Sequence, residues 1–149
     1  QLIWQSGKYY EESVKAALAG KDYDYVVQMP FITRMDMAYK AADLVISRAG
    51  AGSISELCLL GKPALLVPSP NVAEDHQTKN AMALSEKGAA LLIPDSEAVA
   101  RLIDTAMDIV RNDVLLEKMQ QRILSLAQRD SAARIADIIL EIVAEKKSK

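Results

Sequence analysis

The sequence predicts an α/β fold, a Rossmann-like parallel sheet with helices on both faces, and three observations support this prediction. Short apolar runs bounded by turn residues alternate with stretches of helical period, as in stacked βα units. The runs are nearly continuous in apolar character, which is typical of strands buried on both faces. Gly20, Gly61 and Gly88 stand where glycines commonly end helices.

The expected elements follow from these patterns in chain order. The strands are residues 2–5, 25–28, 44–47, 64–67 and 89–93, and the helices between them are 10–19, 35–42, 53–60 and 75–86. After Pro94 the pattern becomes helical only, over residues 96–111, 113–128 and 131–145. We expect these three helices to pack on the sheet. The last one carries an apolar stripe of Ile135, Ile138, Ile139, Ile142 and Val143.

Composition limits the class of protein. The 149 residues are 50% apolar, which suits one domain, 1–149, with a single core. The formal net charge is -2, so the chain lacks the excess of basic residues that is typical of nucleic-acid-binding proteins. One cysteine, Cys58, excludes an internal disulfide and suits a reducing compartment. The apolar runs are too short to cross a bilayer, so we expect a cytoplasmic protein.

The loop at residues 47–53 (SRAGAGS) is the first candidate for chemistry, because ligands of open α/β sheets bind at the carboxyl ends of the strands. It joins an expected strand to a helix and contains two glycines among small residues. Backbone N–H groups in such a loop can approach a phosphate at the positive end of the helix. The spacing is not that of the dinucleotide fingerprint, so an ordinary strand-to-helix turn is the alternative.

Glu56 has two interpretations. Residues 53–56 (SISE) match the capping box S-x-x-E, in which the carboxylate returns to the N-cap amide of its own helix. Alternatively, a carboxylate in the first turn accepts two ribose hydroxyls while the helix end holds phosphates.

A second candidate lies after the fourth expected strand. Residues 68–74 form a loop stiffened by prolines, and Asp75 is expected to cap the following helix. Gln77 and Asn80 share one face of that helix, and their amides suit sugar hydroxyls; an exposed polar face is the alternative. His76 is the only histidine and has no cysteine or carboxylate cluster around it, so no metal site and no cofactor are predicted.

Two shorter loops complete the set of candidates. Residues 6–8 (SGK) follow the first expected strand; Ser6 is suited to donate to a phosphate oxygen, and Gly7 permits close backbone approach. Residues 30–32 (PFI) follow the second expected strand, where backbone groups can pair with the edge of a flat base. An ordinary turn and packing at a strand end explain these loops equally well.

Taken together, several segments resemble the MurG family, the UDP-N-acetylglucosamine:N-acetylmuramyl-(pentapeptide) pyrophosphoryl-undecaprenol N-acetylglucosaminyltransferases. They are residues 5–8 (QSGK), 42–51 (ADLVISRAGA), 55–56 (SE), 61–64 (GKPA), 75–77 (DHQ) and 80–81 (NA). They occur in the family's order, and the chain resembles the C-terminal half of such a GT-B glycosyltransferase.

The resemblance implies a site for the donor UDP-N-acetylglucosamine. Its residues would be Ser6, Ile32, Gly50, Ala51, Gly52, Ser53, Glu56, His76, Gln77 and Asn80. By analogy with the family, Glu56 binds the ribose, the 50–53 loop with Ser6 holds the diphosphate, and Ile32 meets the uracil through its backbone. Gln77 and Asn80 hold the hydroxyls of the N-acetylglucosamine ring, with His76 beside the sugar.

The resemblance also implies an inverting transfer of N-acetylglucosamine from UDP to a lipid-linked muramyl pentapeptide, which converts lipid I to lipid II in peptidoglycan synthesis. The acceptor site, the general base and the membrane-facing patch belong to the N-terminal domain of similar enzymes. That domain and the glycine-rich first βα turn do not appear here, and the chain begins with Gln1 rather than methionine, directly at an expected strand. We therefore expect a fragment that turns nothing over by itself.

Four alternatives stay open at this stage. The first two are another GT-B glycosyltransferase and a stand-alone donor-binding subunit that works with a membrane partner. A UDP-N-acetylglucosamine 2-epimerase shares the fold but needs acid and base residues around the sugar. A binding module without a catalytic parent would bind no nucleotide and would use Glu56 only for capping.

Overall fold

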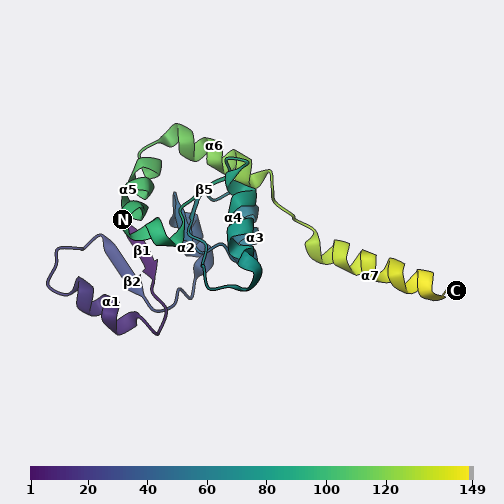
Figure 1. The fold of residues 1–149 in the computed structure, drawn as a ribbon, viewed down its shortest axis with the longest axis horizontal. Helices are drawn as coiled ribbons and strands as arrows, with labels where there is room; N and C mark the ends of the chain where they lie inside the picture. Colours follow the sequence, from purple (N-terminus) through teal and green to yellow (C-terminus); the bar gives the residue numbers. More distant parts are fainter. Residues whose placement is uncertain (148–149) are drawn as a thin grey trace. The chain divides into compact units, whose positions relative to one another are not determined.

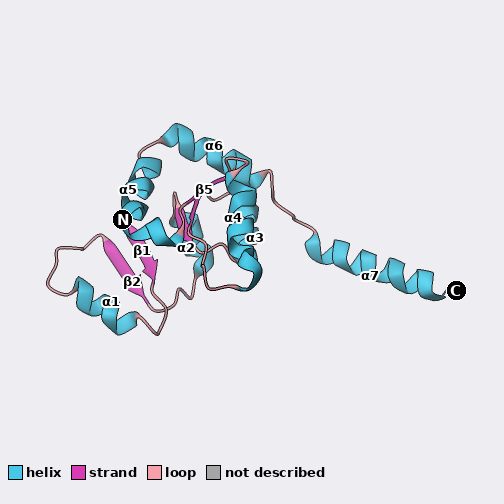
Figure 2. Cartoon of the chain, in the orientation of Figure 1, coloured by secondary structure: helices cyan, strands magenta, loops and turns pink. Residues whose placement is uncertain are grey.

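The computed structural model describes residues 1–147, and their contacts form two compact units, residues 1–42 and residues 43 onward. Strands and helices alternate along most of the chain (Figures 1 and 2). All strand pairing is parallel, as the sequence predicts. Each unit is described by itself.

The first unit contains one parallel pair of strands and two helices. β1 (Leu2–Gln5) pairs with β2 (Val26–Met29), while α1 (Glu11–Leu18) and α2 (Met35–Ala41) follow the two strands. β1 is not buried on both faces, contrary to the sequence prediction: Trp4 is 40% exposed and Ile3 43% exposed. Two strands and two short helices offer too little apolar surface to cover both faces of this pair.

The second unit contains the three-stranded sheet β3-β4-β5. Its elements are β3 (Val45–Ser47), α3 (Ala51–Leu60), β4 (Ala64–Leu66), the 3-10 turn η1 (Ala73–Asp75), α4 (His76–Ser85), β5 (Ala90–Leu92), α5 (Asp95–Val110) and α6 (Asp113–Leu124). The central strand β4 is 0% exposed at all three residues. Because successive side chains of a strand point to opposite faces, both faces of β4 are covered.

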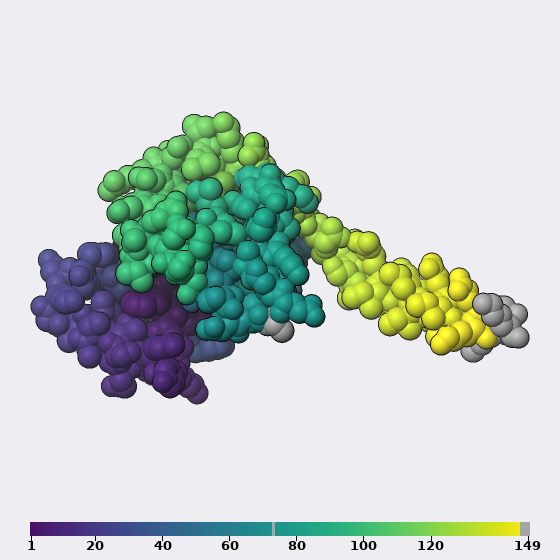
Figure 3. Space-filling view, in the orientation of Figure 1, coloured from purple at the N-terminus to yellow at the C-terminus, as the bar shows by residue number. Residues whose placement is uncertain are grey.

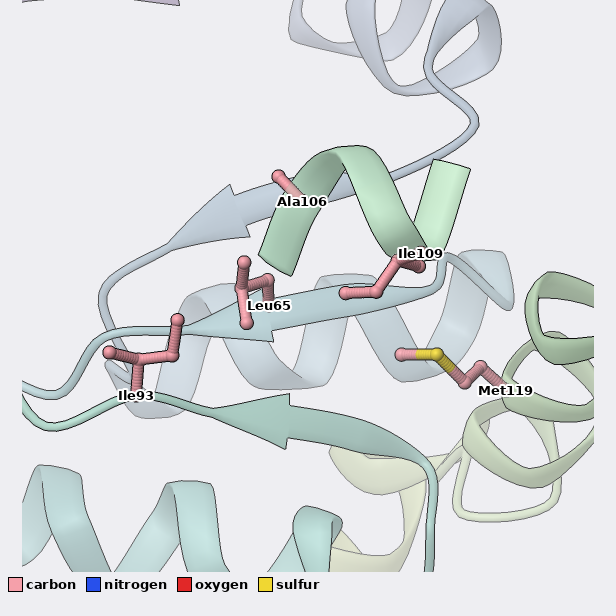
Figure 4. Packing of buried hydrophobic residues seen from close by; sticks show 5 residues of the cluster. All are labelled: Leu65, Ile93, Ala106, Ile109 and Met119. Carbon is pink, nitrogen blue, oxygen red and sulfur yellow. The ribbon is translucent and has the colours of Figure 1, made fainter. Parts of the chain in front are cut away.

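The core of this unit joins the sheet to α5 and α6 (Figure 4). It consists of Leu65 from β4, Ile93 after β5, Ala106 and Ile109 from α5, and Met119 from α6. Burying a side chain as large as leucine or isoleucine stabilises a fold by roughly 1.5–3 kcal/mol. The first two of the three helices predicted after Pro94 therefore pack as expected. They fix the strands whose carboxyl ends carry the candidate loops.

The predicted helix-ending glycines are confirmed. Gly20, Gly61 and Gly88 have φ values of 70°, 62° and 62°, in the left-handed region. At the end of α3, the Gly61 N–H donates to the Cys58 carbonyl, and the Lys62 N–H donates to the Leu57 carbonyl. A glycine is needed there because a Cβ disfavours this conformation.

The last helix departs from the prediction. α7 (Ser131–Lys147) forms where the sequence places a helix, but its residues 131–146 are all exposed (Figure 3). Its apolar side chains include Ile139 at 55% and Leu140 at 65% exposure. The expectation that this helix packs on the sheet is therefore wrong. An apolar stripe predicts that a helix needs a partner surface, but it does not identify that surface. None of the described helices is long and apolar enough to span a membrane.

Candidate functional site

The amino end of α3 is the centre of the candidate site. Gly50 occupies the N-cap position with extended backbone (φ -67°, ψ 145°), and the Ile54 N–H donates to its carbonyl over 3.0 Å. The N–H groups of residues 51–53 therefore precede the first bond of the helix and have no intrahelical acceptor. Together with the helix dipole, they create a positive end that suits an anion.

Gly50 and Gly52 border open space. A Cβ added at either position meets no atom within 4 Å, and neither residue has a left-handed φ. The chain's own conformation and packing therefore do not require glycine at these two positions. Small residues here leave room for an external group to reach the backbone N–H groups.

The start of α3 tests one of the two interpretations of Glu56, the capping box. The helix begins at Ala51 and has no side-chain cap, so the capping box predicted around Ser53 is wrong. The pattern S-x-x-E is present, but the short connection from β3 starts the helix two residues before Ser53. Glu56 is exposed and lies four residues after Gly52. That spacing places both on one face of α3, about 6 Å apart along the axis.

Gln77 and Asn80 join the loops after β3 and β4. The Gln77 Oε1 accepts from the N–H groups of Ala49 (3.2 Å) and Ser69 (2.9 Å). The Asn80 Nδ2 donates to the Ala49 carbonyl over 3.1 Å. Both side chains are partly buried, so the alternative of an exposed polar helix face is wrong. The structure thus brings α4 together with the residue that precedes Gly50.

His76 and Asp75 mark the start of α4. His76 is the first residue of the helix and is exposed. Asp75 occupies the N-cap position, but it has φ 52° and its side chain makes no capping bond, so the predicted cap is wrong. Side-chain capping requires an extended residue at this position, and a left-handed backbone directs the carboxylate elsewhere.

Arg48 is part of the site, although the sequence did not single it out. Its Nη1 donates to the carbonyls of Val67 (3.2 Å) and Pro68 (3.3 Å) and forms an ion pair with Asp95. The available signal was its position, directly after β3 at the edge where ligands of α/β sheets bind. Its partners lie 19, 20 and 47 residues away, so no local pattern reveals them.

The first unit holds the other two predicted residues, Ser6 and Ile32. Ser6 follows β1; its Oγ accepts from the Gln28 Nε2 over 2.7 Å and donates to the Gly7 carbonyl over 3.1 Å. The Ile32 N–H donates to the Gln5 Oε1 over 2.8 Å. The parallel register of β1 and β2 explains this grouping, because it aligns Gln5 with Met29 and so brings the two strand ends together.

Comparison with known proteins identifies the family. Residues 1–138 match the model of the glycosyltransferase family 28 C-terminal domain. The chain belongs to this family. The match covers both units described above and nearly all of the sequence.

Two relatives of this family 28 domain are the UDP-N-acetylglucosamine--N-acetylmuramyl-(pentapeptide) pyrophosphoryl-undecaprenol N-acetylglucosamine transferases of Porphyromonas gingivalis and Cytophaga hutchinsonii. The first is 58% identical over 146 residues, which cover 98% of this chain and 38% of the relative. The second is 45% identical over 143 residues, which cover 96% of this chain and 38% of the relative. The chain thus spans about two fifths of the length of these relatives.

A solved structure supports the same assignment. The crystal structure of Acinetobacter baumannii MurG superposes with a TM-score of 0.83 at 31% identity, covering 93% of this chain and 42% of that chain. With the family match, it confirms the predicted fold, a Rossmann-like α/β domain of the GT-B type.

The family 28 domain also has a groove outside the candidate site. It has a volume of about 630 Å³ and is lined by α3, the end of α4, the segment that links α6 to α7 and the first two residues of α7. None of the predicted site residues lines it. Within residues 1–147, no group of three or more His, Cys, Asp or Glu side chains is arranged to hold a metal ion.

Proposed function

We propose that this chain is the donor-binding half of an inverting N-acetylglucosaminyltransferase that takes UDP-N-acetylglucosamine and acts on a lipid-linked muramyl pentapeptide in peptidoglycan synthesis. The names of its relatives support this proposal. The observation that carries it is the amino end of α3. An open glycine loop there is tied through Ala49 to Gln77 and Asn80, and Glu56 lies one helical turn farther along.

The diphosphate is proposed to bind at the helix end. The N–H groups of Ala51, Gly52 and Ser53 precede the first intrahelical bond of α3 and point out of its positive end. The open space beside Gly50 and Gly52 admits phosphate oxygens to these donors. Such fixed donors also stabilise the charge that develops on a leaving diphosphate.

The ribose is proposed to bind Glu56. A carboxylate accepts hydrogen bonds from two neighbouring hydroxyls, and charge-assisted bonds of this kind are the stronger ones. The displacement of about 6 Å between Gly52 and Glu56 along α3 is of the order expected between a diphosphate and the ribose attached to it.

The sugar ring is proposed to meet Gln77 and Asn80. Their bonds to the loop backbone use the Oε1 of Gln77 and the Nδ2 of Asn80. Hydroxyls of N-acetylglucosamine would therefore be bound by the other polar atoms, the Gln77 Nε2 and the Asn80 Oδ1. Because the loop bonds fix both amides, recognition needs little reorganisation. His76, exposed at the start of α4, is proposed to lie beside the sugar.

The remaining roles stay predictions. Ser6 is predicted to contact the diphosphate and Ile32 the uracil. The acceptor site, the general base and the association with the cytoplasmic face of the membrane are predicted to belong to a preceding domain, and this chain alone is predicted to turn nothing over. Positioning and electrostatic stabilisation are then the contributions of the donor half.

Calorimetric titration of the 149-residue chain tests the proposal. UDP-N-acetylglucosamine, UDP-glucose and UDP are titrated into the unmodified chain and into Glu56→Ala. We expect the N-acetylglucosamine donor to bind best, and Glu56→Ala to bind it about 10- to 100-fold more weakly, because charge-assisted bonds to the ribose are lost.

Glu117→Ala is the matched control, since Glu117 is an exposed helical glutamate on α6 outside the candidate site. It should bind the donor as the unmodified chain does. Equal donor affinities of Glu56→Ala and Glu117→Ala would remove Glu56 from the site. A folded chain that binds none of the three nucleotides would contradict the proposal for this chain.

A further inference from the structure

The ion pair between Arg48 and Asp95 connects three strand ends. Arg48 directly follows β3, the carbonyls that it binds belong to Val67 and Pro68 after β4, and Asp95 comes three residues after the end of β5. One guanidinium thus joins the loops at the carboxyl edge of the whole three-stranded sheet. All three contacts are made by one nitrogen of the guanidinium, the Arg48 Nη1.

Two of these loops carry the candidate donor site. Ala49 is the neighbour of Arg48, and both its N–H and its carbonyl are bonded to α4, through Gln77 and Asn80. Ser69, the neighbour of Pro68, donates to the same Gln77 oxygen. The contacts of Arg48 therefore anchor each loop one residue away from the point where Gln77 joins it.

Because the pair of Arg48 and Asp95 is exposed, its effect on the two loops can be measured apart from its effect on the stability of the fold. The Arg48 side chain is 55% exposed and that of Asp95 is 36% exposed. Exposed ion pairs contribute little to folding because solvent screens them. Loss of the Asp95 charge should therefore leave the core intact while it frees the guanidinium that bridges the loops.

We infer that Asp95 holds Arg48 as a positioning residue that sets the distance between the β3–α3 and β4–η1 loops for donor binding. This inference rests on the proposed function of the same site. The competing role is direct: Arg48 could bind the diphosphate itself, and Asp95 would then compete with the ligand. The two roles predict opposite effects when the Asp95 charge is removed.

The test compares Asp95→Asn with Glu97→Gln in the 149-residue chain. Glu97 is the matched control, because it also lies in the first turn of α5 and also pairs with an exposed arginine, Arg101. Titration with UDP-N-acetylglucosamine should show a loss of about fivefold for Asp95→Asn and none for Glu97→Gln, with thermal midpoints that agree. Arg48→Met should also lose affinity, because it removes the nitrogen that bonds to the loops and keeps an unbranched side chain.

Unchanged or higher affinity of Asp95→Asn would overturn the positioning role, and so would full affinity of Arg48→Met. Backbone amide spectra give a readout that needs no donor: Asp95→Asn should shift the resonances of Ala49 and Ser69, whereas Glu97→Gln should not. If the unmodified chain binds no donor but these shifts appear, the proposed function fails and the loop coupling stands. If neither amide moves, the coupling is wrong whatever the donor does.

Discussion

The two ends of α3 use glycine for different reasons. At the carboxyl end, Gly61 has φ 62°, and an added Cβ would lie 3.4 Å from the Leu124 Cβ and Cδ1. At the amino end, Gly50 and Gly52 have no left-handed φ, and an added Cβ would meet nothing within 4 Å. The fold explains the first glycine but not the other two. A glycine that the fold does not require points to something outside the chain that must approach the backbone.

The largest predicted effect separates binding from stability at the amino end. Gly52→Ala places a methyl group where the diphosphate is proposed to approach, so donor affinity should fall at least about tenfold. The free energy of unfolding should stay unchanged or rise by up to about 1 kcal/mol, because alanine favours a helix more than glycine does. Calorimetric titration and chemical denaturation of the same sample measure both quantities. Full donor affinity of Gly52→Ala would show that no ligand group approaches the backbone at this glycine.

The reverse result is expected at the carboxyl end. Gly61→Ala forces an alanine into the left-handed region, which costs about 1 kcal/mol or slightly more. The donor affinity of the folded protein should not change, since Gly61 lies at the opposite end of α3 from Gly50. Denaturation curves with a lower midpoint, together with an unchanged titration, would agree with this prediction. If Gly61→Ala lost as much donor affinity as Gly52→Ala, both substitutions would affect binding only through the fold.

The two ends of α3 also differ in how well the sequence predicts them. The positions of Gly20, Gly61 and Gly88 were predictable because a left-handed helix end is a local requirement. The start of α3 was not predicted correctly. A capping-box pattern at Ser53 follows a local rule, whereas the end of β3 and its short connection decide where the helix starts. Local sequence rules therefore predict a position correctly where the backbone conformation alone determines which residue is needed.

The candidate site also contains residues that local sequence patterns identify and residues that they do not. The residue types at Glu56, Gln77 and Asn80 and their positions near strand ends were sufficient to single them out. Arg48 was missed because its role depends on Val67, Pro68 and Asp95, which only the folded sheet brings to it. The exposure of α7 was missed for a related reason. The stripe on a helix shows that it has an apolar face, and only the structure shows whether the described chain covers that face.

The smallest predicted effect concerns the middle of α3, where one side of the helix is buried and the other is exposed. Cys58 is 5% exposed, while Glu56, two residues earlier, is exposed. Burial raises the pKa of the Cys58 thiol above its ordinary value of 9.0, and nearby Lys87 partly opposes this shift. The thiol should therefore stay protonated at neutral pH and react slowly with iodoacetamide in the folded chain.

The direction of the pH dependence follows from this shift. Above pH 9.0 the unfolded chain releases the thiol proton, whereas the folded chain retains it, so the contribution of this group to stability falls as pH rises. Cys58→Ala removes the contribution. The difference in unfolding free energy between the unmodified chain and Cys58→Ala should be constant below the ordinary thiol pKa and shrink above it. A difference that stays constant through the thiol titration would place Cys58 in a solvated environment, so that both sides of α3 would be alike at this turn.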